Sequence, residues 1–226
     1  QHGRSGWIRN GWTLRQPNDY ARRMSETFLD KVYNVKGAEE TRTLYDAWSA
    51  SYEDEVGQNG YATPGRCAKA LAQAIDDTSR PILDFGCGTG LSGLALTLSG
   101  FTTIDGVDLS KDMLAQAEAK ELYRSLHQIE ADDPLPDATD YAAICAIGVI
   151  GAGAAPLSLL DKLFETLTPG AYLCFSFNDH TLEDPSFEAR VQDLIASGAA
   201  RENTREYGDH LLGLNIYSVV YVLQKT

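Results

Sequence analysis

The chain has 226 residues, a length that favours one large domain over two small ones. Hydrophobic residues make up 43% and charged residues 23%, which is normal for a globular protein. The formal net charge of −13 argues against a nucleic-acid backbone or an anionic membrane as the main partner, because binding to phosphate needs a basic surface. We therefore expect a globular domain that binds neither nucleic acid nor membrane.

The first 23 residues differ from the rest in charge. They hold five arginines against one acid, Asp19, and Met24 follows directly. We interpret residues 1–23 as an N-terminal extension. It is either a segment added upstream of a natural start at Met24 or a native arm anchored by Trp7 and Trp12. The stretch lacks the long apolar core of a signal peptide.

Four cysteines are widely spaced, and none forms a CxxC or Cys/His pattern with zinc spacing: Cys67, Cys87, Cys145 and Cys174. We expect them to pack as small apolar side chains, and we expect no metal site. Their reduced state would fit a cytoplasmic setting. No apolar run reaches the roughly 18 residues of a membrane span.

Apolar segments alternate with amphipathic ones in the middle of the chain. Strands are predicted at 81–85, 101–109, 125–132, 140–151 and 170–178. Helices are predicted at 90–100, 110–121 and 156–167. This alternation is typical of a mostly parallel sheet with helices on both faces. The nearly continuous apolar run of residues 140–151 fits a central strand that is buried on both sides.

The flanks of this region follow a different pattern. Helices are predicted at 39–55 and 64–76 upstream and at 184–198 downstream. The segments 200–208 and 214–225 then predict two successive strands, which we expect to be antiparallel because no helix separates them. The whole predicts an α/β, Rossmann-like fold with a seven-stranded, mostly parallel sheet and an antiparallel C-terminal hairpin.

The stretch "DFGCGTG" turns from the strand 81–85 into the next helix. Its glycines stand at 86, 88 and 90, and Leu91 breaks the G-x-G-x-x-G spacing of nicotinamide-binding turns. No Gly-Lys-Ser/Thr follows, so a P-loop is excluded. Such a turn lets the backbone approach a ligand at a helix N-terminus, although it could also be a turn without a ligand. The acid at its mouth, Asp84, favours a ligand with a positive group such as an α-amino group.

A second acid, Asp108, ends the strand 101–109, twenty residues after Gly88. This is the offset at which a carboxylate binds the hydroxyls of a ribose. The alternative is a solvated strand-end acid or a helix cap. In the acidic segment 130–137, Asp132 and Asp133 are both candidates to accept a hydrogen bond from an adenine amino group.

The segments "ILDFGCGTG", "GVDLSKDML", "DYAAICAIGVI" and "LTPGAYLCFSF" together resemble the class I S-adenosylmethionine-dependent methyltransferases over residues 81–178. Upstream, "LYDAWSASYEDEV" at 44–56 is similar to the YDxWAxxYD element of the small-molecule branch of that family. Residues 41–178 look closest to the subgroup of the methyltransferase-like protein of the Williams–Beuren region.

The resemblance implies S-adenosyl-L-methionine as cofactor and a single domain over residues 24–226, with a helical lid at 24–78 and a cofactor-binding core at 79–226. Asp84 would support the cofactor's ammonium group, and Asp108 would bind its ribose hydroxyls. The remaining implied contacts fall on the turn, on the adenine side and at the end of the fourth strand: Gly86, Cys87, Gly88, Gly90, Leu109, Met113, Asp132 or Asp133, Ala146 and Ile147.

Three aromatic residues, Tyr45, Trp48 and Tyr52, share one face of the predicted helix 39–55. An aromatic face attracts a sulfonium cation and shields it from water, so with the resemblance we expect a cofactor lid here. The alternative is an ordinary core stripe.

Methyl transfer requires alignment more than acid–base chemistry, so the absence of a recognisable catalytic dyad does not argue against an enzyme. His180 follows the fifth strand, where ligands of parallel sheets gather, and is a weak candidate for contact with the acceptor. The segment "CAIGVIGAG" lacks the Asn-Pro-Pro-Tyr type sequence of nucleic-acid amino methyltransferases, which favours a small-molecule acceptor. The alternatives are a catalytically silent binding or regulatory protein and a nicotinamide-dependent oxidoreductase.

Overall fold

The structure is a computed structural model that describes residues 28–32, 35 and 37–226; the predicted extension, residues 1–23, lies outside the described residues. A seven-stranded sheet of order β3-β2-β1-β4-β5-β7-β6 runs through it. Its strands are β1 (Ile82–Phe85), β2 (Ile104–Asp108), β3 (Ser125–Gln128), β4 (Ala143–Ala146), β5 (Tyr172–Asn178), β6 (Ala200–Leu211) and β7 (Ile216–Lys225). The first five strands pair in parallel, and β7 pairs antiparallel with both β5 and β6. The predicted fold class is confirmed.

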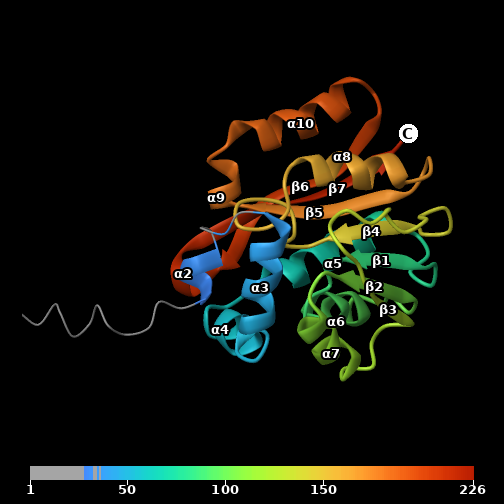
Figure 1. Cartoon of the computed structure of the whole chain (residues 1–226). Coiled ribbons are helices and arrows are strands. Elements are labelled where there is room, and N and C mark those ends of the chain that lie inside the picture. The colour runs from blue at the N-terminus through green and yellow to red at the C-terminus, as the bar shows by residue number, and fades with distance from the viewer. Residues whose placement is uncertain (1–27, 33–34, 36) are drawn as a thin grey trace, which may run out of the picture.

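Helices cover both faces of the sheet (Figure 1). On one face lie α5 (Thr63–Ala74), α6 (Leu91–Leu98) and α7 (Lys111–Glu118), and on the other lie α8 (Ser158–Thr166) and α10 (Pro185–Ala196). A short helix, α9 (Asp179–Leu182), follows β5 directly. Strands β1 and β4 are buried at every position, because both faces of these central strands meet helices.

The fourth strand is shorter than predicted. The apolar run 140–151 predicts a strand throughout, whereas β4 ends at Ala146. Gly148, Gly151 and Gly153 adopt positive φ angles of 71°, 141° and 76°, which turn the chain out of the sheet. The apolar run therefore continues as a loop at the edge of the sheet.

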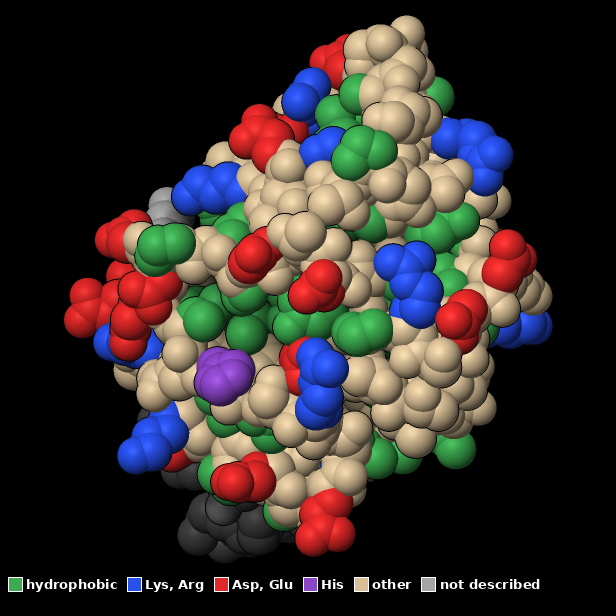
Figure 2. All heavy atoms as spheres, turned by 90° about the vertical axis from the view of Figure 1, so that its right-hand side faces the viewer, with side chains coloured by type: hydrophobic (Ala, Val, Ile, Leu, Met, Phe, Trp, Pro, Cys, Tyr) green, Lys and Arg blue, Asp and Glu red, His purple; other side chains and the backbone are tan. Residues whose placement is uncertain are grey.

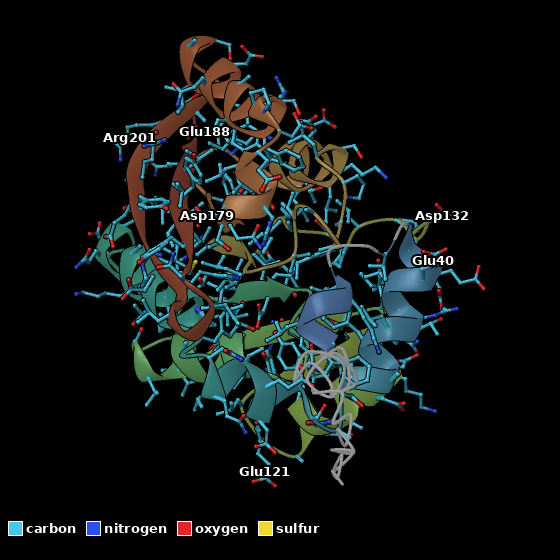
Figure 3. The ribbon with its side chains drawn as sticks, turned by 90° about the vertical axis from the view of Figure 1, so that its left-hand side faces the viewer. Glu40, Glu121, Asp132, Asp179, Glu188 and Arg201 are labelled. Atoms are coloured by element: carbon cyan, nitrogen blue, oxygen red, sulfur yellow. The ribbon has the colours of Figure 1, made fainter. Side chains whose placement is uncertain are left out.

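The predicted helix 39–55 is wrong as a single element, because it divides into α3 (Ala38–Trp48) and α4 (Tyr52–Gln58). Ser49 and Ser51 interrupt it: the Ser49 hydroxyl donates to the Asp46 carbonyl, and the Ser51 hydroxyl donates to the Glu55 carboxylate. Serines that form such local bonds compete with helix continuation. Together with α2 (Phe28–Val32), these helices lie across the carboxyl ends of the parallel strands (Figures 1 and 3).

The terminal hairpin is formed by β6 and β7, with a 3-10 turn at Leu212–Leu214 and Asn215 at a φ of 56° between them. The antiparallel hairpin is thus confirmed. Between β3 and β4, residues 129–142 form no helix, so a loop makes this crossover.

None of the described helices combines the length and the apolar composition needed to cross a bilayer. Acidic and basic side chains are interspersed on the face at the amino ends of the parallel strands (Figure 2).

Candidate active site

The glycine-rich turn follows β1 at the carboxyl edge of the sheet. Gly86, Gly88 and Gly90 all have positive φ angles, of 73°, 54° and 91°. A Cβ on Gly86 would lie 2.5 Å from Cγ2 of Val149, so a larger residue would meet the loop after β4. The amides of Gly86 and Cys87 both donate to the Val107 carbonyl, at 2.8 and 3.0 Å. The turn is therefore held firmly against the end of β2.

Asp108 connects this turn to the start of α7. Its Oδ2 accepts from the Gly88 amide and its Oδ1 from the Ser110 amide, both at 2.8 Å. Ser110 in turn caps α7, with its hydroxyl accepting from the Met113 amide. Burial raises the pKa of Asp108 above its ordinary value, although the amide hydrogen bonds oppose this shift. The carboxylate retains lone pairs that can accept further hydrogen bonds.

Asp84 lies beneath the turn and is fully buried. Its Oδ2 accepts from the hydroxyls of Ser92 and Tyr123, at 2.6 and 2.7 Å. Its Oδ1 has no hydrogen-bond partner among the described residues. Burial raises the pKa of Asp84 to about 6, against the lowering effect of the two hydroxyls. An unpartnered buried oxygen is costly, which marks this position as one that a donor could stabilise.

A cavity of about 490 Å³ opens at the carboxyl edge, a size typical of small-ligand sites. Helix α3, the turn, the loop after β3 and the start of α8 all contribute to its wall. Seven of the residues predicted for the site line it: Tyr45, Gly86, Gly88, Asp108, Leu109, Met113 and Asp132.

A second, much smaller cavity of about 30 Å³ lies on the other side of the turn. Three further predicted residues line it: Tyr52, Cys87 and Ile147. It shares Gly86 and Gly88 with the larger cavity. The hydroxyl of Thr89, another lining residue, is buried and unpartnered among the described residues.

The other predicted residues line neither cavity: Trp48, Asp84, Gly90, Asp133, Ala146 and His180. Trp48 packs in a core cluster with α2 and α4, and Ala146 is fully buried within β4. Of the two candidate acids after β3, Asp132 lines the large cavity, whereas Asp133 accepts from the Glu130 amide within its own loop. His180 lies in α9, with its Nδ1 3.5 Å from a carboxylate oxygen of Glu183. The roles of all these residues remain predictions.

Three polar contacts join the segment that runs from α3 to α4 with α7 and the residues that flank α7. The Ser110 hydroxyl donates to Asp46 at 2.5 Å, the Gln116 amide group donates to the Ser49 carbonyl at 2.6 Å, and the Lys120 ammonium contacts Glu53 at 2.7 Å. Across the cavity mouth, Arg42 of α3 pairs with Glu130 at 2.8 Å. Glu40 and Asp132 mark the same side of this mouth in Figure 3. These contacts hold the helices in place over the site.

Several residues of the site carry no signal in the sequence. Tyr123 binds Asp84 and also accepts from the Gly93 amide at 3.1 Å, and the Lys120 ammonium donates to the Thr89 carbonyl at 2.8 Å. Each contact joins residues at least 30 positions apart. Among the described residues, no group of three or more His, Cys, Asp or Glu side chains is arranged to hold a metal ion.

The fold and the site define a protein of the class I methyltransferase architecture. The sheet is parallel over its first five strands and is extended by the antiparallel strand β7, and the candidate ligand site lies at the carboxyl ends of the parallel strands. The model of the methyltransferase domain family matches residues 60–210. The chain therefore belongs to the methyltransferase domain family, and the resemblance found in the sequence is confirmed at the level of family and fold.

Two curated relatives match part of the chain. Methyltransferase-like protein 27 of Homo sapiens is 34% identical over 137 residues, which cover 59% of this chain and 56% of that protein. Malonyl-[acyl-carrier protein] O-methyltransferase of Halalkalibacterium halodurans is 34% identical over 125 residues, which cover 49% of this chain and 46% of that protein. The matches thus span about half the length of these relatives.

Solved structures share the fold at low identity. A chain in the Haloferax volcanii complex of the Trm112 methyltransferase activator has a TM-score of 0.58 at 16% identity, covering 80% of this chain and 97% of that one. The SAM-dependent methyltransferase of Geobacter sulfurreducens, solved with S-adenosyl-L-homocysteine, has a TM-score of 0.50 at 12% identity, covering 70% and 88%. At these identities the likeness shows the fold alone.

Proposed function

We propose that the chain is an S-adenosyl-L-methionine-dependent methyltransferase that acts on a small-molecule acceptor. The observation that carries the proposal is the position of Asp108, which lines the large cavity while it holds the glycine turn. A carboxylate in this position suits the two neighbouring hydroxyls of a ribose. The fold neighbour from Geobacter sulfurreducens was solved with S-adenosyl-L-homocysteine, the demethylated form of this cofactor, and this supports S-adenosyl-L-methionine as the cofactor.

The residues around both cavities fit the cofactor chemically. Leu109 and Met113 offer an apolar surface to an adenine ring in the large cavity, and Asp132 offers an acceptor to its amino group. Near the small cavity, Asp84 Oδ1 and Thr89 Oγ1 are buried oxygens without partners among the described residues, and an ammonium group has the donors that they lack. We therefore assign the adenosyl half to the large cavity and the amino-acid end to the small one.

When bound, the cofactor supplies a methyl group that is already activated by a positively charged sulfur. The protein's residues would then orient the cofactor and shield its sulfonium group from water. The glycine turn and Asp108 fix the ribose, while Tyr45 and Tyr52 on α3 and α4 keep water from the sulfonium. Alignment of the acceptor with the methyl group provides most of the rate gain in such an in-line transfer.

The acceptor class rests on charge and on the loop after β4. The chain carries a formal net charge of −13, which argues against a nucleic-acid acceptor. The residues after β4, "IGVIGAG", are all glycine or aliphatic and carry no charge, which suits a neutral or apolar acceptor. Malonyl-[acyl-carrier protein] O-methyltransferase, by its name, acts on an acyl group attached to a protein, and a tethered small acyl group is compatible with such a site.

Three narrower proposals accompany this one. We propose that residues 24–78 act as a lid over a core at 79–226, and that the chain falls in the Williams–Beuren-region subgroup. The four cysteines are buried and unbridged, which supports a reducing, cytoplasmic setting.

Calorimetry with S-adenosylmethionine, S-adenosylhomocysteine and NAD tests the proposal. We expect the first two to bind and NAD not to bind. Binding of NAD alone would make the chain a nicotinamide-dependent oxidoreductase. Binding of none of the three would favour a silent member of the fold that acts as a binding or regulatory protein.

A further inference from the structure

Tyr61 occupies the boundary between the two cavities. It lies in the connection between α4 and α5 and lines the small cavity together with Tyr52 and Ile147. A Cβ added to Gly148 would lie 2.7 Å from the Tyr61 hydroxyl oxygen, and Gly148 lines the large cavity. The hydroxyl therefore stands beside the end of β4, where one cavity passes into the other.

This boundary is where the reacting sulfur belongs if the cofactor is placed as proposed above, and the inference rests on that proposed function. In S-adenosylmethionine the sulfonium sulfur joins the adenosyl half to the amino-acid half. The large and small cavities share Gly86 and Gly88 as a common wall. A molecule with one half in each cavity has its sulfur beside that wall, close to Gly148 and Tyr61.

We propose that Tyr61 is the residue that faces the sulfonium and its methyl group. Its hydroxyl oxygen is a weak acceptor for the polarised methyl C–H bonds, and its ring offers an electron-rich surface to the cation. Both contacts require the positive sulfur, which S-adenosylhomocysteine lacks. Tyr61 thereby discriminates between the methylated and the demethylated cofactor.

The C-terminal hairpin and helix α4 together hold Tyr61 in this position, and the Tyr61 amide donates to the Val56 carbonyl of α4 at 3.1 Å. The Tyr61 backbone forms a bridge with Leu211, and the Ala62 amide donates to the His210 carbonyl at 2.9 Å. The Tyr61 ring packs edge-on against the His210 ring, with centroids 5.3 Å apart. The buried Thr63 hydroxyl bonds His210 Nδ1 at 2.7 Å and fixes that ring. Tyr61 is thus anchored to the sheet.

Two side chains beside Tyr61 are neutral at pH 7. Burial lowers the pKa of His210 to about 4, so its imidazole is neutral at pH 7. Burial, together with the neighbouring Tyr61, raises the pKa of Tyr52 well above its ordinary value, so this phenol is neutral as well. A cation beside Tyr61 would therefore lie near the neutral Tyr52 phenol, with the neutral His210 imidazole against the Tyr61 ring.

The test compares the binding of S-adenosylmethionine and S-adenosylhomocysteine to the wild type and to Tyr61→Phe by calorimetry. The substitution keeps the ring and removes the hydroxyl together with its hydrogen bond to Tyr52, a loss that would affect both ligands alike. We expect the affinity for S-adenosylmethionine to fall about two- to fivefold, the equivalent of one weak C–H···O contact. We expect the affinity for S-adenosylhomocysteine to change less than this.

Tyr207→Phe is the matched control, because Tyr207 is an exposed tyrosine that lines neither cavity and whose hydroxyl bonds Asp179. It should leave both affinities unchanged, and thermal unfolding of each variant verifies the fold. Equal losses for the two ligands, or no loss, would overturn the role of Tyr61 while leaving the proposed function intact. A wild type that binds neither ligand would overturn both.

Discussion

The carboxylate of Asp108 accepts a 2.8 Å hydrogen bond from the amide of Gly88, twenty residues earlier in the chain. Its other oxygen accepts from the Ser110 amide at the start of α7. One side chain thus joins the glycine turn to the next β–α junction and lines the large cavity as well. The same acid supports the fold of the site and is available to a ligand, so its removal should affect both.

Replacing Asp108 with alanine should lower cofactor affinity and stability together. We expect S-adenosylmethionine binding to weaken by about 1–3 kcal/mol, because the ribose hydroxyls lose a charged acceptor. Urea unfolding should show a loss of about 1–3 kcal/mol as well, because two amides lose their partner. Asp112→Ala is the control, since Asp112 is an exposed acid in the first turn of α7, four residues after Asp108. Unchanged affinity in Asp108→Ala would contradict the proposed position of the ribose.

Cofactor affinity should depend on pH through Asp84. Because burial raises the pKa of this carboxyl to about 6, it is mostly ionised at pH 7 and mostly protonated at pH 5. If the carboxylate supports an ammonium group, affinity falls on acidification, by up to about tenfold between pH 7 and pH 5. In Asp84→Asn the affinity should be lower at pH 7 and should vary less with pH. Calorimetry at several pH values measures this, and parallel profiles for the two proteins would exclude the role.

Replacing Gly86 with alanine should be more harmful than the same change at Gly170. Both glycines have positive φ angles, 73° and 88°, so alanine costs about 1–2 kcal/mol at either position. A Cβ at 170 meets no atom within 4 Å, whereas a Cβ at 86 lies 2.5 Å from Val149 Cγ2. We therefore expect Gly86→Ala to unfold at lower urea than Gly170→Ala and to bind the cofactor poorly. The double variant Gly86→Ala/Val149→Ala should recover part of the stability, and equal midpoints for the two single variants would show that the contact with Val149 is unimportant.

His210 should make the protein less stable in acid. Its pKa is lowered by burial from 6.5 to about 4, so between these values the unfolded chain binds a proton that the folded chain does not. The stability contributed by neutral His210 is therefore present above pH 6.5 and is lost as the pH falls toward 4. Relative to His210→Gln, the wild type should lose about 2 kcal/mol of unfolding free energy between pH 7 and pH 5. Urea unfolding at both pH values measures the difference, and other titrating groups cancel because both proteins contain them. Equal pH dependence would show that His210 titrates normally.

Local patterns in the sequence predicted the parallel sheet, the antiparallel hairpin and the glycine turn. These succeed because they depend on neighbouring residues: apolar runs form strands, and glycines permit the positive φ angles seen at Gly86 and Gly88. The predicted helix 39–55 failed for a reason that is also local, since the hydroxyls of Ser49 and Ser51 find partners within the same segment.

The sequence by itself determined the class of fold, the place of the ligand site at the end of β1, and Asp108 as an acid near it. Only the tertiary structure decided that Asp132 rather than Asp133 lines the cavity, that Tyr123 binds Asp84, and that Tyr61 stands at the end of β4. The physical reason is distance along the chain. Strand register and helix packing bring residue 61 to residues 148 and 210, and no local pattern records a contact between segments that meet only after the sheet has formed.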